Sequence, residues 1–490
     1  MPETIIAQVS ELLALEGVEG YIVGGYVRDV LLGRWAQDID IAIAGDALEV
    51  GRHVADCLGG TYVPLDKEHR IARVVLIRDG GQGHLDIATL HGAIEADLAW
   101  RDFTINAMAV SLTNLLPGEK SSDVDSRFTV QISAADVVDP FEGLKDLRAG
   151  RIRAVSKQVF QDDPIRLLRA VRLAAQYEFT IDNDTVALIR SHSQLLREVA
   201  QERVRDELIQ LLSLPRSAFY LRCLDELGLL TEVFPELAEM KEVTQPKEHF
   251  WDVFDHSMET VASVERLLML ENEIVVSDPW LGDLVESMES KKGDIKRSVL
   301  LKVAAILHDV AKPRTKNVEA DGRVHFFGHT NEGAEIAGQA LERLKFGKQH
   351  VKMVQEMVAH HLRLWQMGND SLPTRRAIYR YFRSTGEVAF DIILLSLADF
   401  LATQGPRLDL GEWRQHTRMM QYIICEYERD ERIAKPPKLI SGHDLIKLFN
   451  MQPGPEIGRI LEAVREAQGS NEISTREEAL EFVSKHVKCL

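Results

Sequence analysis

A short glycine- and aspartate-rich passage near the N-terminus places the strongest limits on the fold of this chain. Gly24-Gly25 follows the apolar run Tyr21-Ile22-Val23, so a strand is expected to end in a glycine turn. Asp38-Ile39-Asp40 then has the pattern of a second strand, in which residues i and i+2 point to one face. The two aspartates are therefore predicted to lie side by side. Paired carboxylates on one rigid strand suit Mg²⁺, which takes further oxygen ligands from substrate phosphates.

The longer passage Gly24-Gly25-Tyr26-Val27-Arg28-Asp29, followed by Gly33 and Asp38-Ile39-Asp40, resembles the head of class II tRNA nucleotidyltransferases and bacterial poly(A) polymerases, members of the polymerase β superfamily. The resemblance implies nucleotidyl transfer, in which metals bring a hydroxyl in line with an α-phosphate and neutralise the leaving pyrophosphate. Asp38 and Asp40 would then be catalytic and hold Mg²⁺, and Gly24, Gly25 and Arg28 would bind the nucleotide. Taken alone, Asp-Ile-Asp would as readily be a solvated strand end.

Composition limits the class of protein. A chain of 490 residues should divide into three or four domains. The N-terminus does not resemble a signal peptide, and no stretch approaches a membrane span, so no membrane partner is expected. The net charge of -18 is unusual for an RNA enzyme, but the segment 145–205 carries twelve basic and eight acidic residues. The cysteines are scattered, which favours a reducing cytoplasm: Cys57, Cys223, Cys425 and Cys489.

A second motif, Trp100-Arg101-Asp102-Phe103-Thr104-Ile105-Asn106-Ala107-Met108, resembles the family block Arg-Arg-Asp-Phe-Thr-Ile-Asn-Ala-Met. The resemblance assigns nucleotide binding to Arg101, Asp102 and Asn106. Trp100 replaces the first arginine, so one charge expected near the triphosphate is missing. Without the family, Phe103, Ile105 and Met108 would be core residues, and Arg101-Asp102 would be a plain ion pair. Asp86 is a possible third carboxylate, although a strand-end acid is the favoured interpretation.

A third motif begins at Asp162-Asp163-Pro164-Ile165-Arg166. Asp163 is predicted to cap an amphipathic helix that has Pro164 at its first position. The motif resembles the Glu-Asp-x-x-Arg template of tRNA nucleotidyltransferases, in which a carboxylate and a guanidinium recognise the edge of C or A. The residues implied to bind the nucleotide are Asp162, in place of the family's Glu, with Asp163, Arg166 and Arg169.

A set of histidines and aspartates in the second half of the chain resembles the HD phosphohydrolase superfamily. Such a site would hold a divalent metal of unknown identity and direct water at a phosphate ester. The alternative is a decayed HD fold that only packs or binds RNA. The favoured ligands are His256, His308, Asp309 and Asp399, with His329 and His360 as further candidates.

Changes in periodicity predict an α/β head, with a small mixed sheet and helices, followed by an all-α remainder. The resemblance implies that the head is a nucleotidyltransferase domain and that the remainder divides into all-α neck, HD and tail domains. The strands are expected at 21–23, 38–44, 61–63, 72–77 and 84–88, and helices at 4–16, 27–32 and 47–58. The predicted domains are the head at 1–140, a neck with the nucleotide-recognition motif and an RNA contact at 141–240, an HD-type domain at 241–405 and a tRNA-binding tail at 406–490.

The resemblance implies template-independent addition of C and/or A to the 3′ end of tRNA from CTP and ATP. A CCA-adding or CC-adding enzyme is favoured. The CC-adding option arises because the stretch between Asp86 and Arg101 leaves little room for the flexible loop that CCA-adding relatives use when switching from C to A. The alternatives are a poly(A) polymerase, an A-adding enzyme, or an HD phosphohydrolase with a degenerate transferase head.

Overall fold

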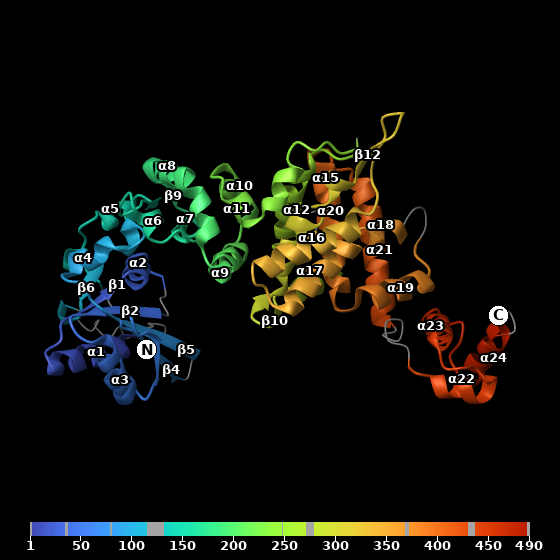
Figure 1. Cartoon of the computed structure of the whole chain (residues 1–490), viewed down its shortest axis with the longest axis horizontal. Coiled ribbons are helices and arrows are strands. Elements are labelled where there is room, and N and C mark those ends of the chain that lie inside the picture. Colours follow the sequence, from blue (N-terminus) through green and yellow to red (C-terminus); the bar gives the residue numbers. More distant parts are fainter. Residues whose placement is uncertain are drawn as a thin grey trace. The chain divides into compact units, whose positions relative to one another are not determined.

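The computed structural model describes residues 2–34, 38–78, 81–114, 132–246, 248–270, 279–367, 372–429 and 437–487. The chain forms two compact units. The first comprises Met1–Val199 with Glu226–Glu232, and the second comprises Ala200–Asp225 with Val233–Leu490. The first unit contains the large sheet, and the second is built almost entirely of helices (Figure 1). Among the described helices, none is both long enough and apolar enough to cross a bilayer.

The head is built on a seven-stranded mixed sheet, which confirms the predicted α/β class. Its strand order is β3-β4-β5-β2-β1-β6-β7. Only β2 and β5 are parallel, and all other neighbours are antiparallel. The last two strands in this order were not predicted, because runs of two and three residues are too short to show periodicity. The strands are β1 (Gly20–Val23), β2 (Asp38–Ile43), β3 (Thr61–Asp66), β4 (Ile71–Arg78), β5 (Gly81–Thr89), β6 (Ala109–Ser111) and β7 (Val137–Val138).

The two faces of this sheet are covered differently. Helices α1 (Pro2–Glu16) and α3 (Ala47–Leu58) lie on one face, where Ile39, Ile41 and Ile43 of β2 are buried (Figure 1). Helix α4 (Ile94–Ala99) packs on the other face against Val23 and Ala42. Since residues i and i+2 of a strand share a face, Asp38 and Asp40 lie on the same side as α4.

The first unit continues with short helices around a two-stranded parallel pair. The pair joins β8 (Arg151–Ile152) to β9 (Thr180–Ile181). Helix α7 (Arg166–Tyr177) begins three residues after Asp163, and no side chain caps it. The predicted cap is therefore wrong: Asp163 directly follows α6 (Val159–Asp162), and its carbonyl oxygen accepts a hydrogen bond from Arg166 N at 3.1 Å.

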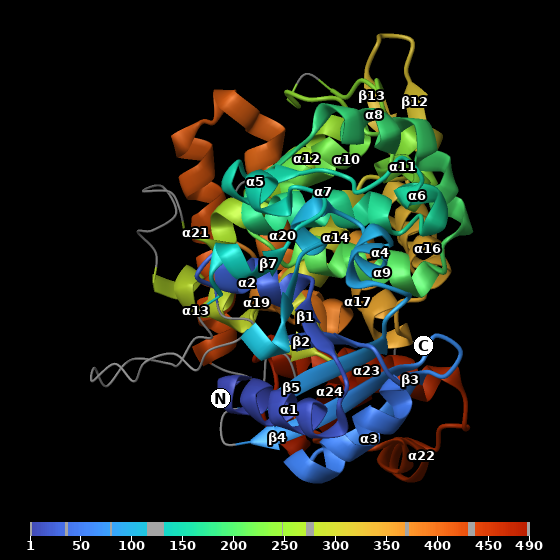
Figure 2. The same ribbon diagram turned by 90° about the vertical axis from the view of Figure 1, so that its left-hand side faces the viewer.

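The second unit is a helical bundle that surrounds α14 (Arg297–Leu307), a helix buried along most of its length. Helices α12, α17 and α20 pack against it, and α16 packs against α17 (Figures 1 and 2). Two small hairpins are the departures from the all-α prediction among the described residues of this unit. One joins β10 (Lys291–Lys292) to β11 (Ile295–Lys296), and the other joins β12 (Lys316–Val318) to β13 (Val324–Phe326). The other helices named here are α12 (Val253–Leu268), α16 (His329–Arg343), α17 (Lys348–His360) and α20 (Ala389–Gln404).

The C-terminal helices α22 (Gly442–Phe449), α23 (Pro455–Gly469) and α24 (Arg476–Val487) share a small core of their own. Helix α22 begins with a capping box, in which Ser441 and Asp444 satisfy each other's backbone N–H groups. Helix α23 contacts α19 (Arg375–Thr385) of the bundle. The boundaries of the four domains set out above stay predictions.

Candidate active sites in the head and in the helical bundle

The two aspartates of β2 share a face with a third carboxylate. Asp40 lies directly opposite Asp86 on β5, and Asp86 in turn lies opposite Arg73 on β4. Arg73 holds Asp86 through two hydrogen bonds of 2.7 and 2.8 Å. Burial raises the pKa of Asp40; Arg101 opposes this shift, while Asp86 and Asp38 add to it. A half-buried carboxylate beside two others favours a bound cation, so this donor set fits a divalent metal.

The glycine turn lets a guanidinium approach these carboxylates. Gly24 has φ of +72°, and a Cβ atom there would lie 2.4 Å from Nη1 of Arg101 and 3.6 Å from Oδ2 of Asp40. A side chain at this position would therefore displace Arg101. The glycine serves both the left-handed turn and the close approach.

A chain of hydrogen bonds fixes the polar residues behind the turn. Nε and Nη2 of Arg28 donate to Asp29 at 2.9 Å, and its Nη1 donates to Oδ1 of Asn106. Asn106 Nδ2 donates to Oδ1 of Asp102 at 2.9 Å, and the other oxygen of Asp102 lies 3.4 Å from Nη1 of Arg169. The second and third motifs are therefore joined side chain to side chain.

These residues surround one polar cavity of about 430 Å³, within the range of roughly 300–1,000 Å³ typical of ligand sites. Arg166 is held at its rim, where Nη2 donates to the carbonyl oxygen of Trp100 at 2.7 Å. Trp100 itself is 61% exposed. The lining residues are Gly25, Arg28, Asp40, Trp100, Arg101, Asp102, Asn106, Asp163, Arg166, Arg169, Arg172, Leu173 and Gln176.

Most of the predicted residues of this site thus come together, and three do not line the cavity. Asp38 is exposed at the start of β2, Asp162 is exposed at the end of α6, and Gly24 is buried in the turn after β1. Sequence reasoning missed Arg172, Leu173 and Gln176. These three residues could have been predicted, because steps of three and four residues from Arg166 and Arg169 place them on the same face of α7.

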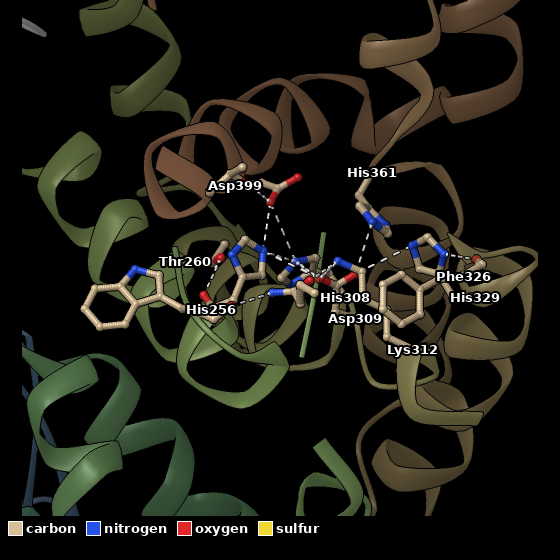
Figure 3. Close-up of polar contacts among 12 residues, drawn as sticks. His256, Thr260, His308, Asp309, Lys312, Phe326, His329, His361 and Asp399 are labelled. Carbon is tan, nitrogen blue, oxygen red and sulfur yellow. Dashed lines mark hydrogen bonds and ion pairs between the residues drawn. The ribbon is translucent and has the colours of Figure 1, made fainter. Parts of the chain in front are cut away.

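The second unit holds a buried cluster of histidines and aspartates (Figure 3). Nε2 of His256 lies 3.0 Å from Oδ1 of Asp399 and 3.2 Å from Nε2 of His308. Asp309 stands between two groups: its Oδ2 lies 3.1 Å from Nε2 of His308, and its Oδ1 lies 3.6 Å from Nε2 of His329. Two sets of ligands are close enough to hold an ion each, His256, His308 and Asp399, and Asp309, His329 and His361.

Backbone carbonyl oxygens orient three of these imidazole rings. Nδ1 of His308 lies 2.9 Å from the carbonyl oxygen of Ala305, and Nδ1 of His361 lies 2.8 Å from that of Val358. Nδ1 of His329 lies 2.6 Å from the carbonyl oxygen of Phe326 (Figure 3). Since a carbonyl can only accept, each Nδ1 carries a proton, and the neutral form of each ring presents a lone pair at Nε2. Such an outer hydrogen bond is typical of metal-binding histidines.

The electrostatics of the cluster also fit a cation. Burial lowers the pKa of His361 to about 3 and lowers that of His329, which keeps both rings neutral. Burial opposes ionisation of Asp309, but the charges of His308 and Lys312 outweigh it and hold the pKa of this carboxyl well below its usual range. Among the described residues, Oδ1 of Asp309 and Nε2 of His329 are buried without a hydrogen-bond partner. A buried acceptor without a partner fits a bound ion.

His361, which was not among the predicted ligands, takes the position expected of His360. His361 is fully buried, and its Nε2 lies 3.7 Å from Oδ1 of Asp309. His360 is the last residue of α17, and its Nε2 lies 3.4 Å from Glu356 outside the cluster. The two histidines point in different directions because successive residues at a helix end are rotated by about 100°.

Replacing His361 by Ala is expected to weaken divalent metal binding at this cluster by at least about tenfold, because a direct ligand matters at least as much as an outer partner. His360→Ala should leave it unchanged. Metal content per chain after dialysis, measured by mass spectrometry on folded protein, tests the pair. Equal losses in both variants would show that the cluster does not bind metal through His361.

The fold and the two sites define a nucleotidyltransferase head joined to an HD domain, and comparisons with known proteins agree. The family described as "Poly A polymerase head domain" matches residues 20–153, "Probable RNA and SrmB- binding site of polymerase A" matches 178–241, and "HD domain" matches 253–401. The head and HD families imply the use of a divalent metal.

Two curated relatives extend over nearly the whole chain. An A-adding tRNA nucleotidyltransferase of Deinococcus radiodurans is 33% identical, covering 95% of this chain and 94% of that protein. A CC-adding tRNA nucleotidyltransferase of Thermus thermophilus is 32% identical, covering 95% and 93%. A solved CCA-adding enzyme in complex with ATP shares the fold, with a TM-score of 0.64 and 22% identity over 99% of this chain and 94% of that chain. This chain therefore belongs to the tRNA nucleotidyltransferase family.

Proposed function

We propose that this enzyme extends the 3′ end of tRNA with C residues from CTP, without a nucleic-acid template. The observation that carries the proposal is the cavity in which Asp40 of the first motif, Arg101 of the second and Arg166 of the third line one space. The relatives named above act on tRNA, and a nucleotide of the size of CTP or ATP suits this cavity.

Asp38 and Asp40 are the proposed ligands of Mg²⁺. A bound metal of this kind acts as a Lewis acid and neutralises charge on the phosphates. Arg101, held against Gly24 close to Asp40, is placed to donate to phosphate oxygens and offset the charge that develops on the leaving pyrophosphate. Arg28 is tied to Asp29 and Asn106, so its proposed role is to position the turn and the amide.

Base selection is proposed to rest on Asp163 and Arg166, which both line the cavity. A carboxylate accepts from the exocyclic amine that C and A share, and a guanidinium donates to neighbouring acceptors on the base edge. The hydrogen bond from Arg166 to the carbonyl oxygen of Trp100 limits the directions in which the guanidinium can point. A fixed fork of donors discriminates between bases better than a mobile one.

The proposed product is CC, with addition of A as the alternative. Strand β5 ends at Thr89 and α4 begins at Ile94, so only four residues, 90–93, connect them. This stretch is too short for the flexible loop that CCA-adding relatives use in changing from C to A. Relatives named CC-adding and relatives named A-adding are about equally similar to this chain, so sequence identity does not distinguish between the two products.

The product can be read directly. The protein is incubated with tRNA that ends at the base before CCA, with CTP, ATP or both, and the 3′ ends are sequenced. Two added C residues with CTP, and no further A when ATP is present, are expected. Addition of A to tRNA ending in CC would refute the CC assignment, and long A tails on unrelated RNA would indicate a poly(A) polymerase.

A second proposed activity is hydrolysis of a phosphate ester at the histidine–aspartate cluster. Its support is the set of three imidazoles whose Nδ1–H groups are fixed on carbonyls and whose Nε2 atoms converge on Asp309. The proposed ligands are His256, His308, Asp309, His329, His361 and Asp399. Metal held there would polarise the ester phosphate and water. The neck and the helices α22–α24 are proposed to contact the RNA.

A further inference from the structure

The last residue of α7, Tyr177, joins this helix to the glycine turn of the head. The hydroxyl of Tyr177 donates to Oδ1 of Asp29 at 2.8 Å, and the tyrosine is buried. Asp29 follows Arg28 in α2 (Gly25–Leu31), the helix that begins at the turn. Tyr177 and Asp29 do not line the nucleotide cavity, so they can act on a bound nucleotide only through other residues.

The surroundings of Tyr177 use both its ring and its hydroxyl. The guanidinium carbons of Arg28 and Arg34 lie 4.4 and 4.8 Å from the centre of the ring, which is a cation–π arrangement. Nε2 of Gln176 donates to the hydroxyl oxygen at 3.2 Å. Burial raises the pKa of Tyr177 to about 12, so the hydroxyl keeps its proton at neutral pH and can donate to Asp29. A phenylalanine at this position would keep the ring contacts and lose the hydrogen bonds.

The hydrogen bond from Tyr177 to Asp29 closes a ring of side chains that leaves α7 and returns to it. The chain of hydrogen bonds described above runs from Asp29 to Arg169 of α7, and Arg169 lies about two turns before Tyr177. Contacts on two different turns fix the rotation of a helix about its own axis, which a single contact leaves open. In order, the members of the ring are Tyr177, Asp29, Arg28, Asn106, Asp102 and Arg169.

The rotation of α7 matters because Arg166, which is proposed to select the base, is the first residue of this helix. Asp163 is joined to it by the backbone hydrogen bond from Arg166 N. The glycine turn depends much less on Tyr177, because Asp29 keeps two hydrogen bonds from Arg28 when the hydroxyl is removed. Loss of the hydroxyl would therefore loosen the helix and leave the turn in place.

We propose that Tyr177 is a positioning residue for base selection, and that its hydroxyl holds α7 in the orientation that presents Asp163 and Arg166 to cytosine. The inference rests on the base selection proposed above. Uracil carries a carbonyl oxygen where cytosine carries its exocyclic amine, so a well-placed carboxylate favours C over U. A misplaced carboxylate loses this advantage. The contacts of the head with the triphosphate stay the same for both nucleotides.

The test compares kcat/KM for CTP and for UTP, measured on the full chain with tRNA that lacks its 3′ end. Tyr177→Phe is expected to lower the ratio of the two values by about tenfold, mainly through a loss with CTP, because a hydrogen bond to a charged group is worth roughly that factor. Tyr177→Leu, which also removes the ring contacts with the two arginines, should lower the ratio further.

Tyr62→Phe is the matched control. Tyr62 lies on β3, contacts Arg52 through its ring and does not line the cavity, so the ratio should stay unchanged. The melting temperature of each variant is measured as well. If Tyr177→Phe only lowers the melting temperature, or lowers kcat/KM equally for CTP and UTP, Tyr177 has a merely structural role and the proposal is overturned.

Arg169→Ala tests the ring itself, because it removes the other contact between the ring and α7. In that background Tyr177→Phe should change the ratio little, since the ring is already open. Full additivity of the two substitutions would overturn the proposal. A wild-type chain that incorporates CTP and UTP equally well would refute the proposed base selection, and this inference with it. A selective wild type whose Tyr177→Phe variant is equally selective would overturn the role of Tyr177 alone.

Discussion

Replacing Asp40 by Asn is expected to reduce CTP incorporation into tRNA by about a thousandfold, because a lost metal ligand removes several kcal/mol of transition-state charge stabilisation. The variant should fold normally. Burial raises the pKa of Asp40 in the folded chain, so in metal-free buffer the ionised side chain costs stability above its unfolded-state pKa of about 4. The neutral amide removes that cost. Thermal unfolding at pH 7 should therefore occur at the same temperature as in the wild type or at a higher one.

Asp86→Asn is the matched control, since the same substitution is made on the neighbouring strand. Asp86 is engaged by Arg73 through two hydrogen bonds, so its loss should reduce incorporation by less than about tenfold. A loss equal to that of Asp40→Asn would make Asp86 a third metal ligand. Full activity of the Asp40 variant would exclude the proposed metal site.

Replacing Asp309 by Asn is expected to abolish hydrolysis of β-glycerophosphate and to lower the metal content of the cluster. The reason is that Asp309 stands between the two groups of ligands, with Oδ2 facing His308 and Oδ1 facing His329. In the wild type, Nζ of Lys312 lies 2.6 Å from Oδ2 of Asp309. The substitution leaves this buried lysine without its ionic partner, so the melting temperature should fall.

The head provides the control for this variant. CTP incorporation should stay within about twofold of the wild type if only the cluster is damaged, since the two units have separate cores. Asp321→Asn, at an exposed aspartate in the same unit, should change neither activity. Hydrolysis that persists in Asp309→Asn would show that the cluster is not the hydrolytic site.

Much of the head could be predicted because its constraints are local. Alternation along β2 fixes which side of the strand carries Asp38 and Asp40, and the structure buries Ile39, Ile41 and Ile43 on the other side as expected. The start of α7 was misplaced, because Asp163 and Pro164 have the composition of a helix cap. Only the position of the preceding helix α6 shows that Asp163 is a link between two helices.

The histidine cluster is formed by helices that are distant along the chain, so most of it could not be predicted from the sequence. One of its residues, His361, could have been predicted. The buried positions Val351, Val354 and Val358 of α17 recur at steps of three and four residues, and the next step reaches His361. His360 falls beside Glu356, one turn earlier on another face. The stacking of Trp365 with Phe400 and His416 could not be foreseen in this way, since the three rings come from three helices that are separated along the chain: α18 (Arg363–Met367), α20 and α21 (Leu410–Arg429).

The most direct test of the central claim is a crystal structure of the protein with Mn²⁺ and a non-hydrolysable CTP analogue, with the metal located by anomalous scattering. The account predicts an anomalous peak bound by carboxylate oxygens of both Asp38 and Asp40 and by phosphate oxygens of the nucleotide in the head cavity. A nucleotide bound in this cavity with no metal at the two aspartates, or a metal held elsewhere in the head, would contradict it.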